Sequence, residues 1–152
     1  MKFNQDSKSF PGTYACDIMK AEGFTDCTGC PYYEPLSLKI LIIKLGALGD
    51  VIRTVPLVEA LKKKYGYECQ ITWIVDKEAL VFVKDHVERA WAYTPELGFK
   101  LQYETFDVAY GLEITPPATF LMNLVQAKTK YGYGLALNGH PYALNPKAEY
   151  YL

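Results

Sequence analysis

The segment that begins at Lys39, "KILIIKLGALGDVIRTVP", constrains the fold more than any other part of the chain. Its opening residues form an almost unbroken apolar run, which predicts a strand over 39–45 that is buried on both faces. A glycine-containing loop follows, and apolar residues then recur at helical spacing over 51–65. A buried strand that passes through such a loop into a helix is typical of a parallel α/β sheet.

Strand and helix patterns continue to alternate along the chain. Further strands are predicted over 69–76, 89–93, 106–113 and 129–135, and further helices over 77–86 and 116–128. This alternation predicts an open parallel sheet with helices on both faces, a Rossmann-like α/β arrangement. We expect this domain to occupy 38–152, where it ends in a turn-rich tail, and to follow an irregular cysteine-containing arm over 1–37.

The amino-acid composition argues against several classes of protein. Half of the 152 residues are apolar and 22% are charged, which suits one folded domain and excludes a disordered chain. The net charge of −1 argues against a nucleic-acid partner. No apolar stretch reaches the roughly 18–20 residues of a membrane span, and the N-terminus lacks the apolar centre of a signal peptide. We therefore expect a cytoplasmic protein, with peripheral contact with the inner membrane left open.

The loop after the first strand lies where ligands gather in such a fold. Gly46 and Gly49 permit close approach of a ligand, and the amides at a helix start attract anions, so nucleotide binding is one hypothesis. The loop matches neither the dinucleotide fingerprint nor the Walker pattern. Asp50 has two interpretations: it caps the following helix, or it acts as a general base on a bound hydroxyl.

The first two strands and the helix between them resemble the start of glycosyltransferase family 9, the ADP-heptose:lipopolysaccharide heptosyltransferases. That family's pattern is an apolar strand, a lysine, an L-G-D loop, a helix with threonine and proline, and a strand containing W-V. The counterparts here are Lys44, Leu48-Gly49-Asp50, Thr54, Pro56 and Trp73-Ile74-Val75. Two later segments, "FDVAYGLE" and "AKTKYGYGL", are also similar, so the resemblance spans residues 38–135.

The resemblance implies the N-terminal half of a GT-B fold, in which two Rossmann-like domains face each other across a cleft. This half would bind a glycan or glycolipid acceptor, and a C-terminal domain absent from this chain would bind the nucleotide-sugar donor. The implied reaction transfers a heptose-like sugar, with inversion and without a required cofactor, to a lipopolysaccharide-core or other glycan acceptor. We expect activity from the full-length enzyme and none from this fragment. The alternative is a non-catalytic nucleotide-binding or metal-binding Rossmann-like module.

The same resemblance assigns the site residues. Asp50 would be the catalytic base, and the acceptor-binding residues would be Lys44, Gly46, Gly49, Arg53 and Glu113. Lys44 either steadies an anionic acceptor or reaches solvent from the strand end. Arg53 either meets acceptor phosphates or is a solvated surface residue. Glu113 either hydrogen-bonds an acceptor hydroxyl or caps the next helix.

Three of the four cysteines lie in the arm. Cys27 and Cys30 form a C-x-x-C pair and Cys16 offers a third ligand, so a structural zinc or an iron–sulfur cluster is one hypothesis. The arm is similar to a D-C-x-x-F-x-G-x-x-P-C segment followed by C-x-x-C in a subset of family 9-like proteins, with Ser7 in place of the first cysteine. The alternatives are free thiols near the surface, or a loop that is held by the packing of Tyr14, Phe24, Tyr32 and Tyr33.

Overall fold

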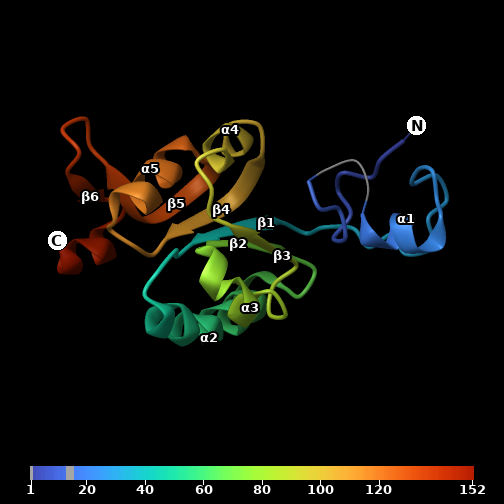
Figure 1. Cartoon of the computed structure of the whole chain (residues 1–152), viewed down its shortest axis with the longest axis horizontal. Coiled ribbons are helices and arrows are strands. Elements are labelled where there is room, and N and C mark those ends of the chain that lie inside the picture. Colours follow the sequence, from blue (N-terminus) through green and yellow to red (C-terminus); the bar gives the residue numbers. More distant parts are fainter. Residues whose placement is uncertain (1, 13–15) are drawn as a thin grey trace.

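A computed structural model describes residues 2–12 and 16–152 (Figure 1). Within these residues, a six-stranded sheet has the strand order β3-β2-β1-β4-β5-β6. Its strands are β1 (Lys39–Ile43), β2 (Gln70–Val75), β3 (Arg89–Ala92), β4 (Thr105–Gly111), β5 (Gln126–Leu135) and β6 (Pro141–Ala143). The first five strands are parallel, and β6 pairs with β5 in the antiparallel direction. The predicted α/β sheet is confirmed, with an antiparallel edge strand that was not predicted.

Helices cover both faces of this sheet (Figure 1). The helices are α1 (Asp17–Glu22), α2 (Leu48–Tyr65), α3 (Leu80–Val83), α4 (Leu97–Leu101) and α5 (Pro116–Leu124), with 3₁₀ turns η1 (Lys77–Ala79) and η2 (Pro146–Tyr151). Helices α2 and α3 pack on one face, and α4 and α5 pack on the other. Among the described helices, none combines the length and the apolar character that crossing a membrane requires.

Strand β1 forms the centre of both hydrophobic cores. Ile40 and Ile42 belong to the core under α2, whereas Leu41 and Ile43 belong to the core under α5. All four side chains are fully buried, because successive residues of a strand point to opposite faces of the sheet. Burial of each such side chain stabilises the fold by about 1.5–3 kcal/mol, which explains why both halves of the chain collapse around this strand.

Several boundaries differ from the predicted ones. Helix α2 begins at Leu48 rather than at 51, so the L-G-D sequence forms its first turn. Helix α5 ends at Leu124 rather than at 128, because Val125 adopts extended backbone with φ −59° and ψ 130°. Strand β5 consequently starts at Gln126 rather than at 129. The predicted helix over 77–86 is shorter and divides into η1 and α3, and α4 was not predicted.

The arm is less irregular than predicted, since it contains α1 and a bridge between Ser7 and Pro35. Its contacts with the sheet domain are made at the amino end of β2. The Gln70 side-chain amide donates to the backbone oxygens of Lys8 and Phe10, at 2.8 and 3.2 Å. This places the arm at the end of the sheet away from the β1–α2 loop (Figure 1).

The alternative in which aromatic packing holds the cysteine loop stays a prediction; three of its four rings lie in the described residues, and each is more than a third exposed. These are Phe24, Tyr32 and Tyr33; Tyr14 lies outside the described residues.

Candidate active site

An open cleft of about 630 Å³ lies beyond the carboxyl ends of β1 and β4. Four of the six predicted site residues meet there: Lys44, Asp50, Arg53 and Glu113. Lys44 follows β1, Asp50 and Arg53 belong to the first turns of α2, and Glu113 follows β4. The rest of the lining is Thr54, Leu57, Leu112, Ile114 and Tyr133. The cleft therefore combines two cations and two carboxylates with an apolar wall.

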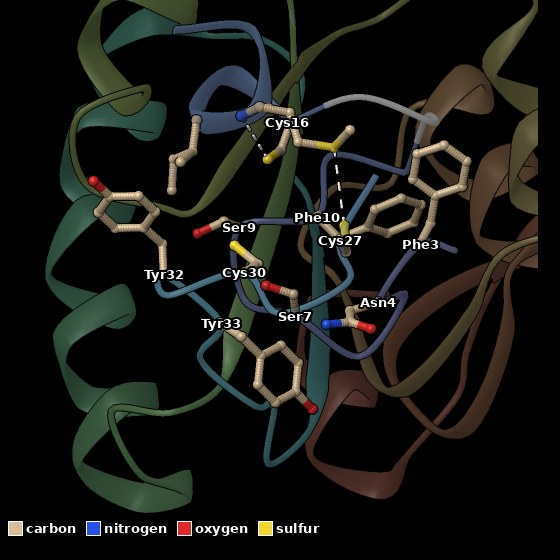
Figure 2. A pocket seen from close by; sticks show the side chains of 12 residues that line it. Phe3, Asn4, Ser7, Ser9, Phe10, Cys16, Cys27, Cys30, Tyr32 and Tyr33 are labelled. Atoms are coloured by element: carbon tan, nitrogen blue, oxygen red, sulfur yellow. Dashed lines mark hydrogen bonds between the residues drawn. The ribbon is translucent and has the colours of Figure 1, made fainter. Parts of the chain in front are cut away.

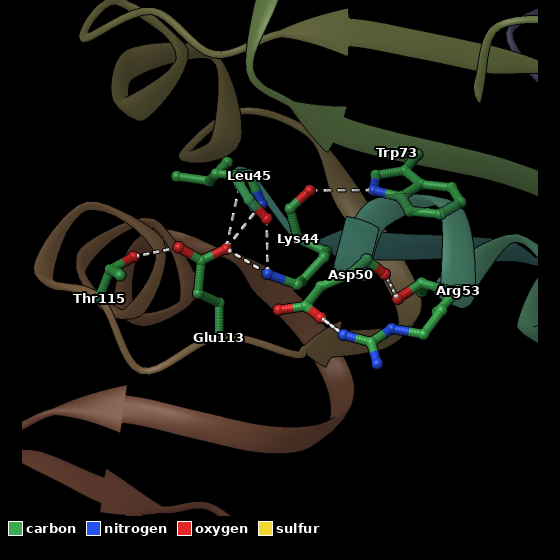
Figure 3. A network of polar contacts seen from close by, with 9 residues as sticks. Lys44, Leu45, Asp50, Arg53, Trp73, Glu113 and Thr115 are labelled. Atoms are coloured by element: carbon green, nitrogen blue, oxygen red, sulfur yellow. Dashed lines mark hydrogen bonds and ion pairs between the residues drawn. The ribbon is translucent and has the colours of Figure 1, made fainter. Parts of the chain in front are cut away.

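Asp50 presents its carboxylate at the rim of this cleft, where the side chain is 46% exposed. The N-cap of α2 is Ala47, with no side-chain cap, so the interpretation of Asp50 as the capping residue is wrong. Its Oδ1 instead forms an ion pair with Arg53 one helical turn later (Figure 3). Within the described part of the chain, no protein group is bonded to Oδ2 of Asp50, so this oxygen is available to a ligand.

Lys44 does not reach solvent, since only 7% of the residue is exposed. Its ammonium donates to the backbone oxygen of Gly46 at 2.8 Å and lies 3.1 Å from Oε2 of Glu113 (Figure 3). The Trp73 indole donates to the Lys44 backbone oxygen at 3.2 Å. The solvent-reaching alternative for Lys44 is therefore wrong, and its charge is fixed at the floor of the cleft.

Glu113 connects the loops that follow two neighbouring strands. Its Oε2 accepts from the amides of Leu45 and Gly46, at 2.9 and 3.3 Å, and its Oε1 accepts from the Thr115 hydroxyl at 2.6 Å. Burial would raise the pKa of Glu113, but the hydrogen bonds from Thr115, Lys44 and the two amides outweigh it and lower the pKa below its ordinary value. Glu113 is thus an ionised brace of the loop after β1.

The two predicted glycines, Gly46 and Gly49, differ in what surrounds them. The left-handed position of the loop is Ala47, with φ 53°, and neither Gly46 nor Gly49 has a positive φ. A side chain at Gly46 would come within 2.9 Å of the Asp76 carboxylate, whereas one at Gly49 would meet nothing within 4 Å. A side chain at position 46 would therefore displace the Asp76 carboxylate, whereas packing leaves room for one at position 49.

Asp76 is a further acid beside this loop, at the end of β2. Burial, followed by the neighbouring carboxylates of Glu113 and Glu78, raises the pKa of Asp76 above its ordinary value. Lys44 opposes this rise but does not cancel it. The pKa of Asp76 is therefore raised and that of Glu113 is lowered, because only Glu113 receives several hydrogen bonds.

Two hydroxyl-bearing residues that line the cleft, Thr54 and Tyr133, were not predicted as site residues. The Thr54 hydroxyl donates to the backbone oxygen of Asp50 at 2.7 Å and so supports the first turn of α2. Tyr133, in β5, also lines the cleft. The sequence could have indicated Tyr133 as a site residue, because it lies in a strand beside β4 and neighbouring parallel strands end at the same edge of a sheet.

The arm cysteines are separate from this cleft. Cys16, Cys27 and Cys30 line one small pocket within the arm (Figure 2). Among residues 2–12 and 16–152, no three cysteine, histidine or acidic side chains are already placed to hold a metal ion. The metal site at these cysteines therefore stays a prediction.

Solved structures that are similar to this chain in fold include two of one enzyme and one of another. The E. coli heptosyltransferase WaaC with ADP matches 62% of this chain and 35% of its own, with 17% identity and a TM-score of 0.54. The same enzyme with ADP-2-deoxy-2-fluoro heptose matches 62% and 36%, with 16% identity and a TM-score of 0.51. A glycosyl transferase of family 9 from Veillonella parvula DSM 2008 matches 65% and 33%, with 19% identity and a TM-score of 0.55.

Identities this low show similarity of fold alone, and at that level these matches confirm the predicted resemblance. The matched region spans about a third of the length of each solved structure. No protein-family model matches the chain, and no curated protein matches it.

Proposed function

We propose that this chain is the acceptor-binding domain of an inverting glycosyltransferase. The enzyme would move a heptose-like sugar from a nucleotide-sugar to a lipopolysaccharide-core or other glycan acceptor. The observation that carries the proposal is the Asp50 carboxylate, half exposed on the rim of an open cleft at the carboxyl edge of the sheet. The fold likeness to two glycosyltransferases, one of them solved with ADP and with an ADP-sugar analogue, supports it.

The chemistry follows from the free oxygen of Asp50. In the proposed step, Oδ2 accepts the proton of an acceptor hydroxyl while the hydroxyl oxygen attacks the anomeric carbon of the donor sugar. The bond from that carbon to the nucleotide diphosphate breaks, and the diphosphate leaves with the electron pair. Attack from the face opposite the leaving group inverts the anomeric centre. Arg53 holds Oδ1, so the carboxylate keeps one orientation without losing its second oxygen.

The charges of the cleft suit an acceptor that carries both hydroxyls and an anionic group. Arg53 is 79% exposed and can exchange part of its contact with Asp50 for a phosphate or carboxylate of the acceptor. Lys44 is already paired with Glu113, so its ammonium stays fixed at the floor and makes no mobile contact with the acceptor. The apolar wall formed by Leu57, Leu112 and Ile114 suits the carbon face of a sugar ring.

The donor site is assigned to a second domain, since the matched region is about a third of each similar glycosyltransferase structure. On this proposal the present domain binds acceptor without catalysing transfer. A glycolipid acceptor would bring the enzyme to the cytoplasmic side of the inner membrane as a peripheral protein. The proposed reaction requires no metal. Its base, Asp50, and the cation that orients this base, Arg53, both come from α2.

The proposal is tested with Asp50→Asn in the full-length enzyme that contains this domain. Asparagine cannot accept the hydroxyl proton, so we expect turnover to fall by about 10²–10⁴-fold. The folded domain should be unaffected, because Asp50 is not the helix cap and its ion pair is exposed. Turnover is measured as nucleotide diphosphate released from the nucleotide-sugar in the presence of acceptor.

Asp85→Asn is the matched control, since Asp85 is an exposed aspartate outside the cleft. Near-normal turnover in Asp50→Asn, with Asp85→Asn equally active, would refute the base assignment. Binding of free nucleotide by the isolated domain, with no binding of acceptor glycan, would instead favour the alternative of a non-catalytic nucleotide-binding module.

A further inference from the structure

The arm, over the described residues 2–12 and 16–37, has almost no hydrophobic core. Met19 is the one residue in these two ranges that is buried. The arm touches the sheet domain through polar contacts such as those of Gln70, which do not replace a core. Units of fewer than about 40 residues usually need disulfides, a metal or a partner subunit to stay folded. The defined path of this arm therefore calls for a cross-link.

The residues that could supply it face one pocket. Cys16 precedes α1, and Cys27 and Cys30 lie in the loop that follows α1. Ser7, which comes from the first loop of the arm, lines the same pocket (Figure 2). All three thiols are free. The three cysteines, together with Ser7 and Ser9, thus line a single pocket.

The chemistry of this pocket favours soft metal–sulfur bonds. Among the described residues that line it, none is acidic, basic or a histidine, and aromatic rings such as those of Phe3, Phe10 and Tyr32 form much of the wall. Thiolates bind zinc and iron in preference to hard cations such as calcium or magnesium. An apolar wall with cysteine ligands is also the usual setting of an iron–sulfur cluster.

The thiols are held only weakly in their present rotamers. The Cys16 sulfur accepts from the Met19 amide at 3.4 Å, and the Cys27 thiol donates to the Met19 sulfur at 3.9 Å. Sulfur is a weak donor and a weak acceptor, so turning these side chains toward each other costs little compared with a metal–thiolate bond. This rotation is needed, since the described residues do not already place three ligands around an ion.

We propose that Cys16, Cys27 and Cys30 form a three-thiolate metal centre that folds the arm, with Ser7 at its fourth corner. Each thiol loses its proton to solvent as a sulfur–metal bond forms, and no electron transfer is required when zinc binds. An iron–sulfur cluster would use the same thiolates with iron and inorganic sulfide supplied during assembly. The centre is structural, because it lies in the arm and outside the cleft that contains Asp50.

Metal analysis of the purified chain, prepared without chelator and without oxygen, tests this inference. We expect about one zinc per chain, or iron and sulfide in matching amounts with visible absorption. Cys16→Ser and Cys30→Ser should each lose most of the metal. Cys69→Ala, which removes the buried cysteine of the sheet domain, should retain it and is the matched control. Ser7→Cys should bind more tightly, with loss to a chelator slowed by ~10-fold or more.

Limited proteolysis supplies a readout that does not depend on activity. Chelation should speed cleavage inside the arm and leave the sheet domain intact. The inference is overturned if the chain takes up neither zinc nor iron with sulfide after reconstitution. Metal retained by a Cys16→Ser, Cys30→Ser double variant would also overturn it, and so would a Cys27–Cys30 disulfide in the metal-free native protein. The gain expected from Ser7→Cys keeps the test decisive if a cysteine variant fails to fold.

Discussion

Glu113 Oε2 lies 3.1 Å from Lys44 Nζ, although the two residues are 69 positions apart in the chain. The contact joins the loops that follow β1 and β4, which are neighbours in the sheet. Because the same carboxylate also receives the amides of Leu45 and Gly46, it fixes the loop that leads into the first turn of α2. The position of the Asp50 carboxylate therefore depends on an acid that comes from a distant part of the sequence.

The ion pair at the cleft floor should be measurable as stability. Lys44→Met leaves a buried carboxylate without its cation, so we expect the free energy of unfolding to fall by about 2 kcal/mol. Lys63→Met is the control, because Lys63 is 70% exposed and its pair with Glu59 should be worth less than about 0.5 kcal/mol. Urea denaturation at neutral pH compares the two variants. Equal, small losses would show that the contact does not hold the loop.

Acid should weaken the fold through Glu113. Folding lowers the pKa of this side chain, so its ionised form favours the folded state. The resulting stabilisation is complete above the ordinary glutamate pKa of about 4.3 and is lost as pH falls through the lowered folded value. Unfolding measured from pH 7 to pH 3 should therefore be less pH-dependent in Glu113→Gln than in the unsubstituted protein. An unchanged pH dependence would contradict this account of Glu113.

The two glycines of the loop should respond differently to alanine. Gly46→Ala places a methyl group 2.9 Å from the Asp76 carboxylate, so Asp76 must shift, at a cost of about 1 kcal/mol. Gly49→Ala meets nothing within 4 Å and lies in a helix, where alanine is preferred, so it should stabilise the domain by about 0.5–1 kcal/mol. Thermal unfolding of both variants tests the contrast. Destabilisation by Gly49→Ala would mean that this position is packed.

Arg53 should affect substrate binding more than folding. Arg53→Gln removes the mobile cation of the cleft, so for an anionic acceptor we expect KM to rise about tenfold. The melting temperature should change little, because the side chain is 79% exposed. Lys64→Gln, an exposed cation at the other end of α2, is the control. Because Arg53 also holds Oδ1 of Asp50, kcat should fall as well, and a fall in kcat with an unchanged KM would show that Arg53 does not contact the acceptor.

The central strand and the place of the cleft could be predicted because simple rules govern them. Ile40 to Ile43 form an apolar run that only a doubly covered strand can bury, and ligands meet parallel sheets at the carboxyl edge. The brace formed by Glu113 could not be predicted. It depends on the register that pairs Ile43 with Gly111, and no local pattern encodes this register.

The end of α5 was misplaced for a different reason. Leu121, Met122 and Val125 face the same core at helical spacing and Ala127 packs against it, so the apolar pattern continues past the true end of the helix. The hairpin into β6 did have a signal. Asn138-Gly139 is a turn dipeptide, and Gly139 takes the left-handed position, with φ 78°, at the end of a three-residue loop that the bond from the Ala136 amide to the His140 oxygen closes. Its second strand is only Pro141–Ala143, too short for a recognisable alternation.

The side-chain amide of Gln70 holds the arm at one end of the strands, while acceptor chemistry is assigned to their other end. On the proposed function, the arm can therefore be altered, shortened or replaced without rebuilding the cleft that contains Asp50. A homologue without the arm should keep this cleft and should have a residue other than glutamine at position 70.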